Sequence, residues 1–259
     1  MLRRILIFLL IAVMQTSALS AGQKTARPVV SILGDSYSTY QGYIPDGNEV
    51  WYFNPCDTTR TDVDNVNQTW WRQLIDKGNY RLGKNESYSG ATISYRGYRG
   101  ADYRDRSFIT RLPKVGNPDI LLIFGCTNDS WAGVPAGEYD FGRTAPDSLL
   151  YTFRPAMRRL ADDAVIMYPE AEIYFVINSE LRPEIVESVK EICNHYNISY
   201  IQLENIDKKR GHPTRKGMTA IADQILRHLE QHSRYSGTAR RVEAGERKNY
   251  KTRPQNPER

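Results

Sequence analysis

Hydrophobic positions along this chain alternate between short continuous runs and longer stretches with helical spacing. Four apolar runs predict buried β-strands, at residues 28–33, 119–124, 171–177 and 198–203. Apolar side chains recur every three or four residues over 150–164 and 218–229, which predicts amphipathic helices. Strands that alternate with helices favour a parallel sheet covered on both faces. We therefore predict an α/β fold, a single-domain three-layer α/β/α sandwich around a mainly parallel sheet.

Two stretches depart from this pattern, at residues 37–66 and 92–114. Both are rich in Tyr, Gly, Asp and Arg and only weakly periodic. Long segments of this kind are typical of loops that carry function, and we expect them to be insertions lying over the edge of the sheet.

The two ends of the chain differ from its body. Arg3 and Arg4 precede an apolar run at 5–14, and small residues at Ala18 and Ser20 suit a cleavage site. This predicts a signal peptide at 1–20, a domain at 21–232, and a secreted or periplasmic protein with no stable membrane insertion after cleavage. An uncleaved anchor is the alternative. Beyond residue 232 apolar periodicity ends, which predicts a basic, disordered tail at 233–259.

Charge is concentrated at these ends. The sequence pI is about 9.0 and the formal net charge is +5. Residues 232–259 alone account for +5 and the leader arginines for +2, which leaves −2 for the body. A nucleic-acid partner is therefore not expected.

The three cysteines, Cys56, Cys126 and Cys193, are an odd number for an exported protein, so at most one disulfide can form. Cys126 ends a buried strand and Cys193 lies on a predicted helix, so we expect both to pack as small apolar residues. No CxxC or His-rich spacing indicates a metal site, and neither a metal nor another cofactor is expected.

Candidate chemistry lies where the predicted strands end, because open parallel sheets bind ligands beyond the carboxyl ends of their strands. Ser36 follows the first strand in a Gly-Asp-Ser turn, and His212 precedes the last helix. A serine becomes a nucleophile when a base takes its proton and donors await the oxyanion. His212 is the candidate base, and Asn128 and the Gly90 amide are candidate donors.

These residues resemble the four blocks of the SGNH (GDSL-like) hydrolase family. Residues 34–38, 89–91, 125–129 and 212–214 look like its Ser, Gly, Asn and His blocks, in order. The resemblance covers about residues 28–231 and implies a flavodoxin-like sheet and a serine esterase of the carbohydrate-esterase type. It implies that Ser36 attacks the acyl carbon, with His212 as base and then acid. The implied oxyanion hole comprises the Ser36 amide, the Gly90 amide and the Asn128 side chain.

The sequence departs from the family at two places. The triad acid usually stands three residues before the histidine, where this chain has Lys209. Asp207, five residues before His212, is the candidate acid if Gly211 allows an unusual turn. Otherwise a backbone carbonyl orients His212 in a dyad, or an acid from another loop substitutes. Cys126 stands where many relatives have Gly.

Each of these residues also has a structural interpretation. Ser36 could be a turn serine, Gly90 a turn glycine, Asn128 a helix cap and His212 a surface histidine. The four blocks together favour catalysis. The α/β-hydrolase alternative is disfavoured because Ser38 stands where its G-x-S-x-G motif requires glycine.

Aromatic residues flank the predicted nucleophile, and aromatic faces stack on sugar rings. Tyr37, Tyr40, Trp51 and Tyr95 are candidate substrate-binding residues, although packing the loops together is an alternative role for each. The loops hold no cluster of Leu, Ile or Phe for a long acyl chain, which favours a short-chain ester, an acetyl group on a carbohydrate. A lysophospholipase or thioesterase, or a noncatalytic glycan-binding module, are the alternatives. The sequence does not indicate an oligomeric state.

Overall fold

The protein has a parallel five-stranded sheet at its centre. The computed structural model describes residues 27–142 and 146–236. Its strands are β1 (Val29–Gly34), β2 (Arg81–Ser87), β3 (Ile120–Gly125), β4 (Glu172–Ile177) and β5 (Ser199–Gln202). They pair in parallel in the order β2-β1-β3-β4-β5. This is the flavodoxin-like order of doubly wound sheets, and the four predicted strands are all present.

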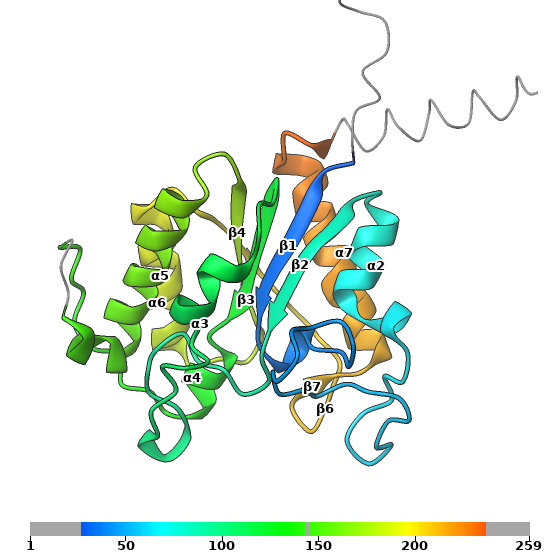
Figure 1. The fold of residues 1–259 in the computed structure, drawn as a ribbon, viewed down its shortest axis with the longest axis horizontal. Helices are drawn as coiled ribbons and strands as arrows, with labels where there is room; N and C mark the ends of the chain where they lie inside the picture. The colour runs from blue at the N-terminus through cyan, green and yellow to red at the C-terminus, as the bar shows by residue number, and fades with distance from the viewer. Residues whose placement is uncertain (1–26, 143–145, 237–259) are drawn as a thin grey trace, which may run out of the picture.

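Helices cover both faces of the sheet (Figure 1). On one face lie α3 (Phe108–Arg111), α5 (Phe153–Met167) and α6 (Pro183–His195), packed through side chains such as Phe108, Leu160 and Val189. On the other lie α2 (Trp70–Lys77) and α7 (Arg215–His232), packed through Trp70 and Ile225. Each helix turns its apolar stripe toward the sheet. The predicted three-layer α/β/α fold is confirmed.

Short elements complete the chain. Helix α4 (Thr127–Trp131) follows β3, and β6 (Lys208–Lys209) and β7 (His212–Pro213) form an antiparallel hairpin before α7. Single 3₁₀ turns are found at η2 (Ser36–Ser38), η3 (Val66–Gln68), η4 (Tyr98–Gly100), η5 (Leu112–Lys114) and η6 (Asp147–Tyr151).

Strand β2 has no counterpart in the sequence prediction. Its residues read Arg-Leu-Gly-Lys-Asn-Glu-Ser, and most of its first four are exposed. A strand at the edge of a sheet pairs on one side only and does not need an apolar sequence. The pattern of hydrophobic positions therefore cannot reveal it.

The segment 92–114 is not only an insertion over the sheet edge, as the sequence predicted. Its second half forms α3 and η5, and Phe108, Ile109 and Leu112 are buried in the core on one face of the sheet. The segment 37–66 contains only short 3₁₀ turns and loops, as expected.

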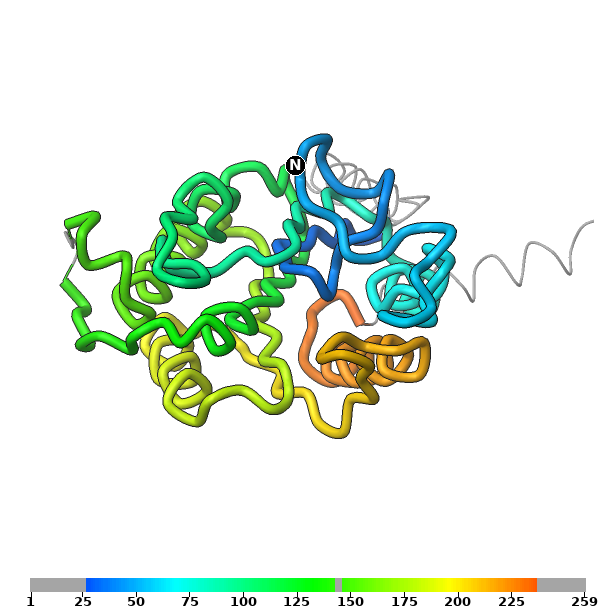
Figure 2. The backbone as a smooth tube through the Cα atoms, turned by 90° about the horizontal axis from the view of Figure 1, so that it is seen from below, coloured from blue at the N-terminus to red at the C-terminus, as the bar shows by residue number. Residues whose placement is uncertain are grey.

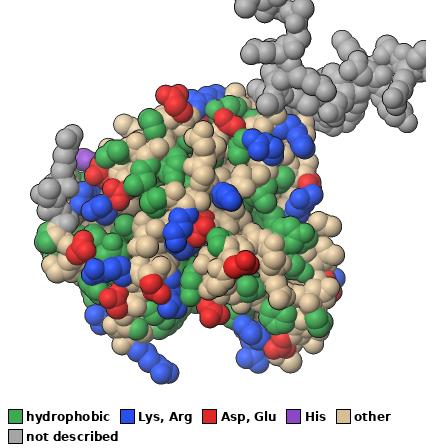
Figure 3. Space-filling view, viewed as in Figure 1, with side chains coloured by type: hydrophobic (Ala, Val, Ile, Leu, Met, Phe, Trp, Pro, Cys, Tyr) green, Lys and Arg blue, Asp and Glu red, His purple; other side chains and the backbone are tan. Residues whose placement is uncertain are grey.

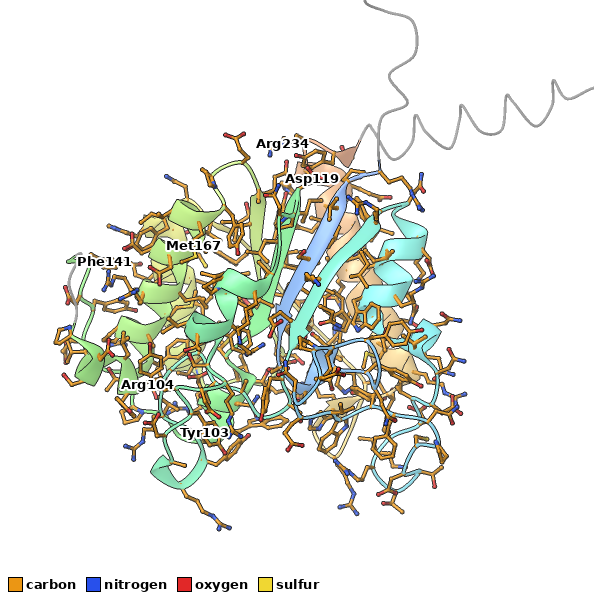
Figure 4. The ribbon with its side chains drawn as sticks, in the orientation of Figure 1. Tyr103, Arg104, Asp119, Phe141, Met167 and Arg234 are labelled. Atoms are coloured by element: carbon orange, nitrogen blue, oxygen red, sulfur yellow. The ribbon has the colours of Figure 1, made fainter. Side chains whose placement is uncertain are left out.

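The carboxyl ends of the strands face the lower edge of the molecule in Figure 1, where the connecting loops collect. Figure 2 views this edge from below, and early (blue), middle (green) and late (yellow to orange) parts of the chain approach its centre. Tyr103 and Arg104 lie in the lower part of the molecule, whereas Asp119 and Arg234 lie at the opposite, upper edge (Figure 4).

The described chain begins and ends at the upper edge (Figure 1). Ser233 is buried and the Arg234 amide donates to the Glu172 carboxylate at 2.8 Å, so the ordered domain extends beyond the predicted boundary at 232. The predicted signal peptide and the rest of the predicted tail lie outside the described residues.

Acidic and basic side chains lie side by side over the face seen in Figure 3, with no broad area of one sign. Within residues 27–142 and 146–236, no helix is long and apolar enough to cross a bilayer.

Candidate active site

Ser36 lies in a tight turn directly after β1. The turn requires Gly34, because a Cβ atom there would come within 2.5 Å of the Ser87 hydroxyl and 2.7 Å of Ser38. Asp35 caps the turn, its carboxylate accepting a hydrogen bond from the Tyr37 amide at 3.0 Å. Burial raises the pKa of Asp35 to about 7. The Gly-Asp-Ser turn is thus closely packed and capped, and it fixes Ser36 at the end of β1.

His212 meets Ser36 across a large separation in sequence. Its Nε2 lies 2.9 Å from the Ser36 Oγ. Both side chains are buried, with 2 % of Ser36 and 5 % of His212 exposed. The β6–β7 hairpin delivers the imidazole, and its turn uses the left-handed conformation at Arg210 (φ 50°) and Gly211 (φ 78°). The unusual turn predicted at Gly211 is present.

The other imidazole nitrogen does not contact Asp207. His212 Nδ1 lies 3.2 Å from the carbonyl of Arg210. The hairpin register pairs Lys209 with His212, so Asp207 comes opposite Thr214. The Asp207 side chain is exposed and accepts a hydrogen bond from the Thr214 hydroxyl. The structure therefore does not place the predicted acid on the imidazole, and the backbone-carbonyl alternative matches the geometry.

Burial lowers the pKa of His212 to about 4, and the cationic Arg60 and Lys208 side chains act in the same direction. The hydrogen bond to the Arg210 carbonyl opposes them. A carbonyl at Nδ1 selects the tautomer with a proton there, which leaves Nε2 free to accept the Ser36 proton. At neutral pH the imidazole is uncharged and can act as a base.

Asn128 lies in the first turn of α4 and does not cap it, since Cys126 holds the N-cap position. Its Nδ2 donates to the Ala91 carbonyl at 2.9 Å, and its Oδ1 accepts from the Tyr98 hydroxyl at 2.8 Å. The two contacts fix the amide plane, and one of its two N–H groups is not used by the Ala91 contact. This geometry suits an oxyanion donor.

Asp129 ties the loop that follows Gly90 to α4. Its buried carboxylate accepts from the amides of Ile93 and Ser94 at 2.8 and 3.0 Å. Burial raises its pKa to about 6. Gly90 itself has φ 83°, and space is open where a Cβ would be. Asn128 and Asp129 thus hold the turn that carries the predicted Gly90 donor beside the end of β3.

Arg111 supports the same strand ends from inside the protein. It is 1 % exposed and donates to the carbonyls of Gly34 and Glu86, at the ends of β1 and β2. Burial lowers its pKa to about 10, which leaves it cationic at neutral pH. The guanidinium satisfies carbonyls that lie beside the turn that carries Ser36.

All three cysteines are free, and Cys126 and Cys193 are buried as expected. Cys126 has φ 63°, a left-handed conformation that glycine adopts without strain. A glycine at this position, as the resemblance implies for many relatives, would adopt this conformation without strain. Among the described residues no group of three or more His, Cys, Asp or Glu side chains could hold a metal.

Three of the four predicted substrate-binding aromatics are packing residues. Tyr37 is fully buried against Phe124, and its hydroxyl donates to the Gly211 carbonyl. Tyr40 is 6 % exposed and donates to the Asp64 carbonyl, and Tyr95 is 8 % exposed within the core. The burial of these three side chains fits the loop-packing alternative.

The fourth, Trp51, lies against the candidate base, His212. Its indole stacks on the His212 imidazole with ring centroids 3.4 Å apart and an interplanar angle of 8°. The Arg60 guanidinium lies 4.0 Å from the centroid of the same indole.

Two residues near the site were not predicted from sequence. Trp131 is 42 % exposed, and its ring centroid is 5.7 Å from that of His212. Tyr98 contacts Asn128. The spacing of Asn128 and Trp131, three residues apart on one helix, could have indicated a shared face. The contact of Tyr98 depends on a loop and leaves no such signal.

The family model for GDSL-like lipases and acylhydrolases matches residues 28–229. The chain belongs to this family. A solved structure of a candidate GDSL-like lipase from Bacteroides ovatus is 53% identical, with a TM-score of 0.78, and the match covers 80% of this chain and 100% of that one. One from Bacteroides uniformis is 45% identical, with a TM-score of 0.78 and coverage of 80% and 98%.

More distant structures share the fold. A family two carbohydrate esterase from Clostridium thermocellum, in complex with cellohexaose, is 17% identical, with a TM-score of 0.54 and coverage of 82% and 66%. No curated protein sequence matches the chain. As a member of the GDSL-like family, the protein is an ester-hydrolysing enzyme.

Proposed function

We propose that this esterase removes a short-chain acyl group, an acetyl ester, from a carbohydrate through an acyl-enzyme on Ser36. The observation that carries the proposal is the buried 2.9 Å contact between Ser36 Oγ and His212 Nε2. It joins a nucleophile and a base at the strand edge where doubly wound folds bind ligands.

In the first half-reaction, Ser36 Oγ bonds to the acyl carbon while its proton passes to His212 Nε2. The negative charge moves to the carbonyl oxygen, where the Ser36 amide, the Gly90 amide and Asn128 Nδ2 donate. The tetrahedral intermediate collapses, and the leaving alcohol takes the proton from His212. Water then attacks the acyl-enzyme with His212 as base, which releases the carboxylic acid and restores Ser36.

The surroundings of the site support a sugar ester over a long-chain lipid. Trp131 is the one large hydrophobic side chain that is both exposed and in contact with His212 among the described residues. A single exposed indole offers a flat face for a sugar ring, whereas a long acyl chain needs an extended apolar groove. The structures named as a carbohydrate esterase and as an acetyl xylan esterase share the fold at 17% and 14% identity.

The test compares acyl length and leaving group. We expect the rate of p-nitrophenyl acetate hydrolysis to exceed that of p-nitrophenyl octanoate. We also expect the protein to release acetate from members of a panel of acetylated oligosaccharides. Ser36→Ala is the control and should abolish both activities. Activity that survives this substitution would reject the nucleophile, a preference for octanoate would favour a lipase, and no activity on any ester would favour a glycan-binding module.

The predicted signal peptide supports export, and we propose a secreted or periplasmic location. Cell fractionation of the full chain would test it, since the intact leader on a cytoplasmic protein would contradict the proposal.

A further inference from the structure

The indole of Trp51 is covered on both sides. His212 stacks on one face in parallel at 3.4 Å, and that contact leaves no room there for a second group. The Arg60 guanidinium, 4.0 Å from the indole centroid, therefore occupies the other face. A sugar ring has no free face of Trp51 to stack on, so the role predicted from sequence does not fit this side chain.

His212 lacks the carboxylate that orients the base in a full triad. Its Nδ1 contacts one backbone carbonyl at 3.2 Å, and its Nε2 contacts Ser36. A carbonyl sets the tautomer but carries no full charge to stabilise the imidazolium that forms when Ser36 attacks. A second contact is therefore needed to hold the ring plane, which a triad carboxylate would otherwise do.

We propose that Trp51 is a positioning residue for His212, which holds the imidazole by parallel stacking in place of a triad carboxylate, with Arg60 bracing the indole from behind. The inference rests on the proposed function of Ser36 and His212. The indole face restricts rotation of the imidazole, and by covering the ring it keeps His212 uncharged and able to accept the Ser36 proton at neutral pH.

Trp51 is itself tied to the nucleophile turn. Its amide donates to the Thr39 hydroxyl at 2.9 Å, and that hydroxyl donates to the Ser36 carbonyl at 3.0 Å. Hydrogen bonds link Ser36 to Thr39 and Thr39 to Trp51. The indole of Trp51 stacks on His212, which in turn contacts Ser36. Among the described residues the buried Trp51 Nε1 has no hydrogen-bond partner. Ring contacts therefore set the orientation of the indole, and a phenyl ring could replace it without losing a hydrogen bond.

The charged and titratable groups around His212 are few. Arg60 lies across the indole, Lys208 lies on the adjoining strand of the hairpin, and the Tyr37 ring packs 5.4 Å from the imidazole. Both cations disfavour the imidazolium. Removing the indole lets water reach the imidazole, and since burial is the largest influence on its pKa, that pKa should rise.

The first experiment separates orientation of the base from substrate binding, using p-nitrophenyl acetate and four variants. Trp51→Leu should lower kcat by about tenfold, as expected when the base is less well oriented toward Ser36, with KM within about twofold. Trp51→Phe should recover most of this loss. Tyr43→Leu removes an exposed aromatic from the same insertion, which packs on Tyr40 and Trp71, and should leave kcat unchanged. Ser36→Ala reports on the proposed function separately.

The second experiment follows the His212 imidazole by NMR titration in the Ser36→Ala background, where no turnover occurs. Trp51→Leu and Arg60→Gln should each raise the His212 pKa, because the first admits water to the imidazole and the second removes a cation that disfavours the imidazolium. A Trp51 that only packs its own loop, without covering the imidazole, would leave that pKa unchanged. Circular dichroism melting checks that each variant is folded. If Trp51→Leu does not fold, the kcat of Trp51→Phe and the kcat and His212 pKa of Arg60→Gln test the inference instead.

The inference is overturned if Trp51→Leu keeps kcat within about twofold, or raises KM alone, while Ser36→Ala is inactive. A His212 pKa that does not respond to Arg60→Gln, together with unchanged kcat, overturns it as well. Activity that survives Ser36→Ala instead refutes the proposed function, so the two failures are distinguishable.

Discussion

Replacing Asp207 by asparagine or alanine tests whether a carboxylate orients His212. In a serine protease triad, changing the acid to its amide lowers kcat by about 10⁴, because the wrong tautomer forms. Here the Asp207 side chain is exposed and bonded to Thr214, and the imidazole contacts the Arg210 carbonyl. An exposed charge that does not touch the base acts weakly through solvent, so both variants should keep kcat within about threefold.

Substitution of Asp207 should instead lower the stability of the fold. Thr214 is the N-cap of α7, and its hydroxyl accepts from the Gly217 amide at 3.2 Å. Asp207→Ala removes the acceptor that holds this hydroxyl and should lower the free energy of unfolding by about 1 kcal/mol. Asparagine retains an acceptor oxygen and should lower it less. Urea unfolding measures both.

The assay is steady-state hydrolysis of p-nitrophenyl acetate, with Asp62→Asn as matched control. Asp62 is an exposed carboxylate that accepts from the Arg215 amide at 2.9 Å, at the start of the same helix. If Asp207→Asn loses a thousandfold or more in kcat while remaining folded and Asp62→Asn does not, the dyad interpretation is refuted.

Two further predictions follow from the site geometry. Asn128→Ala removes one oxyanion donor and should lower kcat by about 10²–10³ with little change in KM, measured on the same ester; full activity would exclude Asn128 from the oxyanion hole. The pKa of His212 is lowered to about 4 by burial, and a base works when neutral, so kcat/KM should stay level from neutral pH downward and fall only as pH approaches 4. An acidic limb near the usual pKa of histidine, in a pH series with a stable ester, would contradict the burial described for this imidazole.

Much of the fold was determined by the sequence pattern. Apolar runs such as 119–124 are typical of central strands in a parallel sheet, because strands covered on both faces have no polar side. The helical spacing at 218–229 likewise fixed the face that α7 buries. The sequence pattern did not predict strand β2, because an edge strand has no such constraint. It did not predict helix α3, because its apolar residues, Phe108 to Leu112, are too few to show a helical period.

The sequence also indicated Ser36, Asn128 and His212 as one site, since each follows or precedes an element that ends at the same sheet edge. Only the tertiary structure decided how they are held. The hairpin register placed Asp207 opposite Thr214, and the loop at 37–66 folded Trp51 onto the imidazole. Hydrophobic periodicity and sequence motifs report on residues that are close together in the sequence. These contacts instead depend on how irregular loops, distant in sequence, come together in the folded chain.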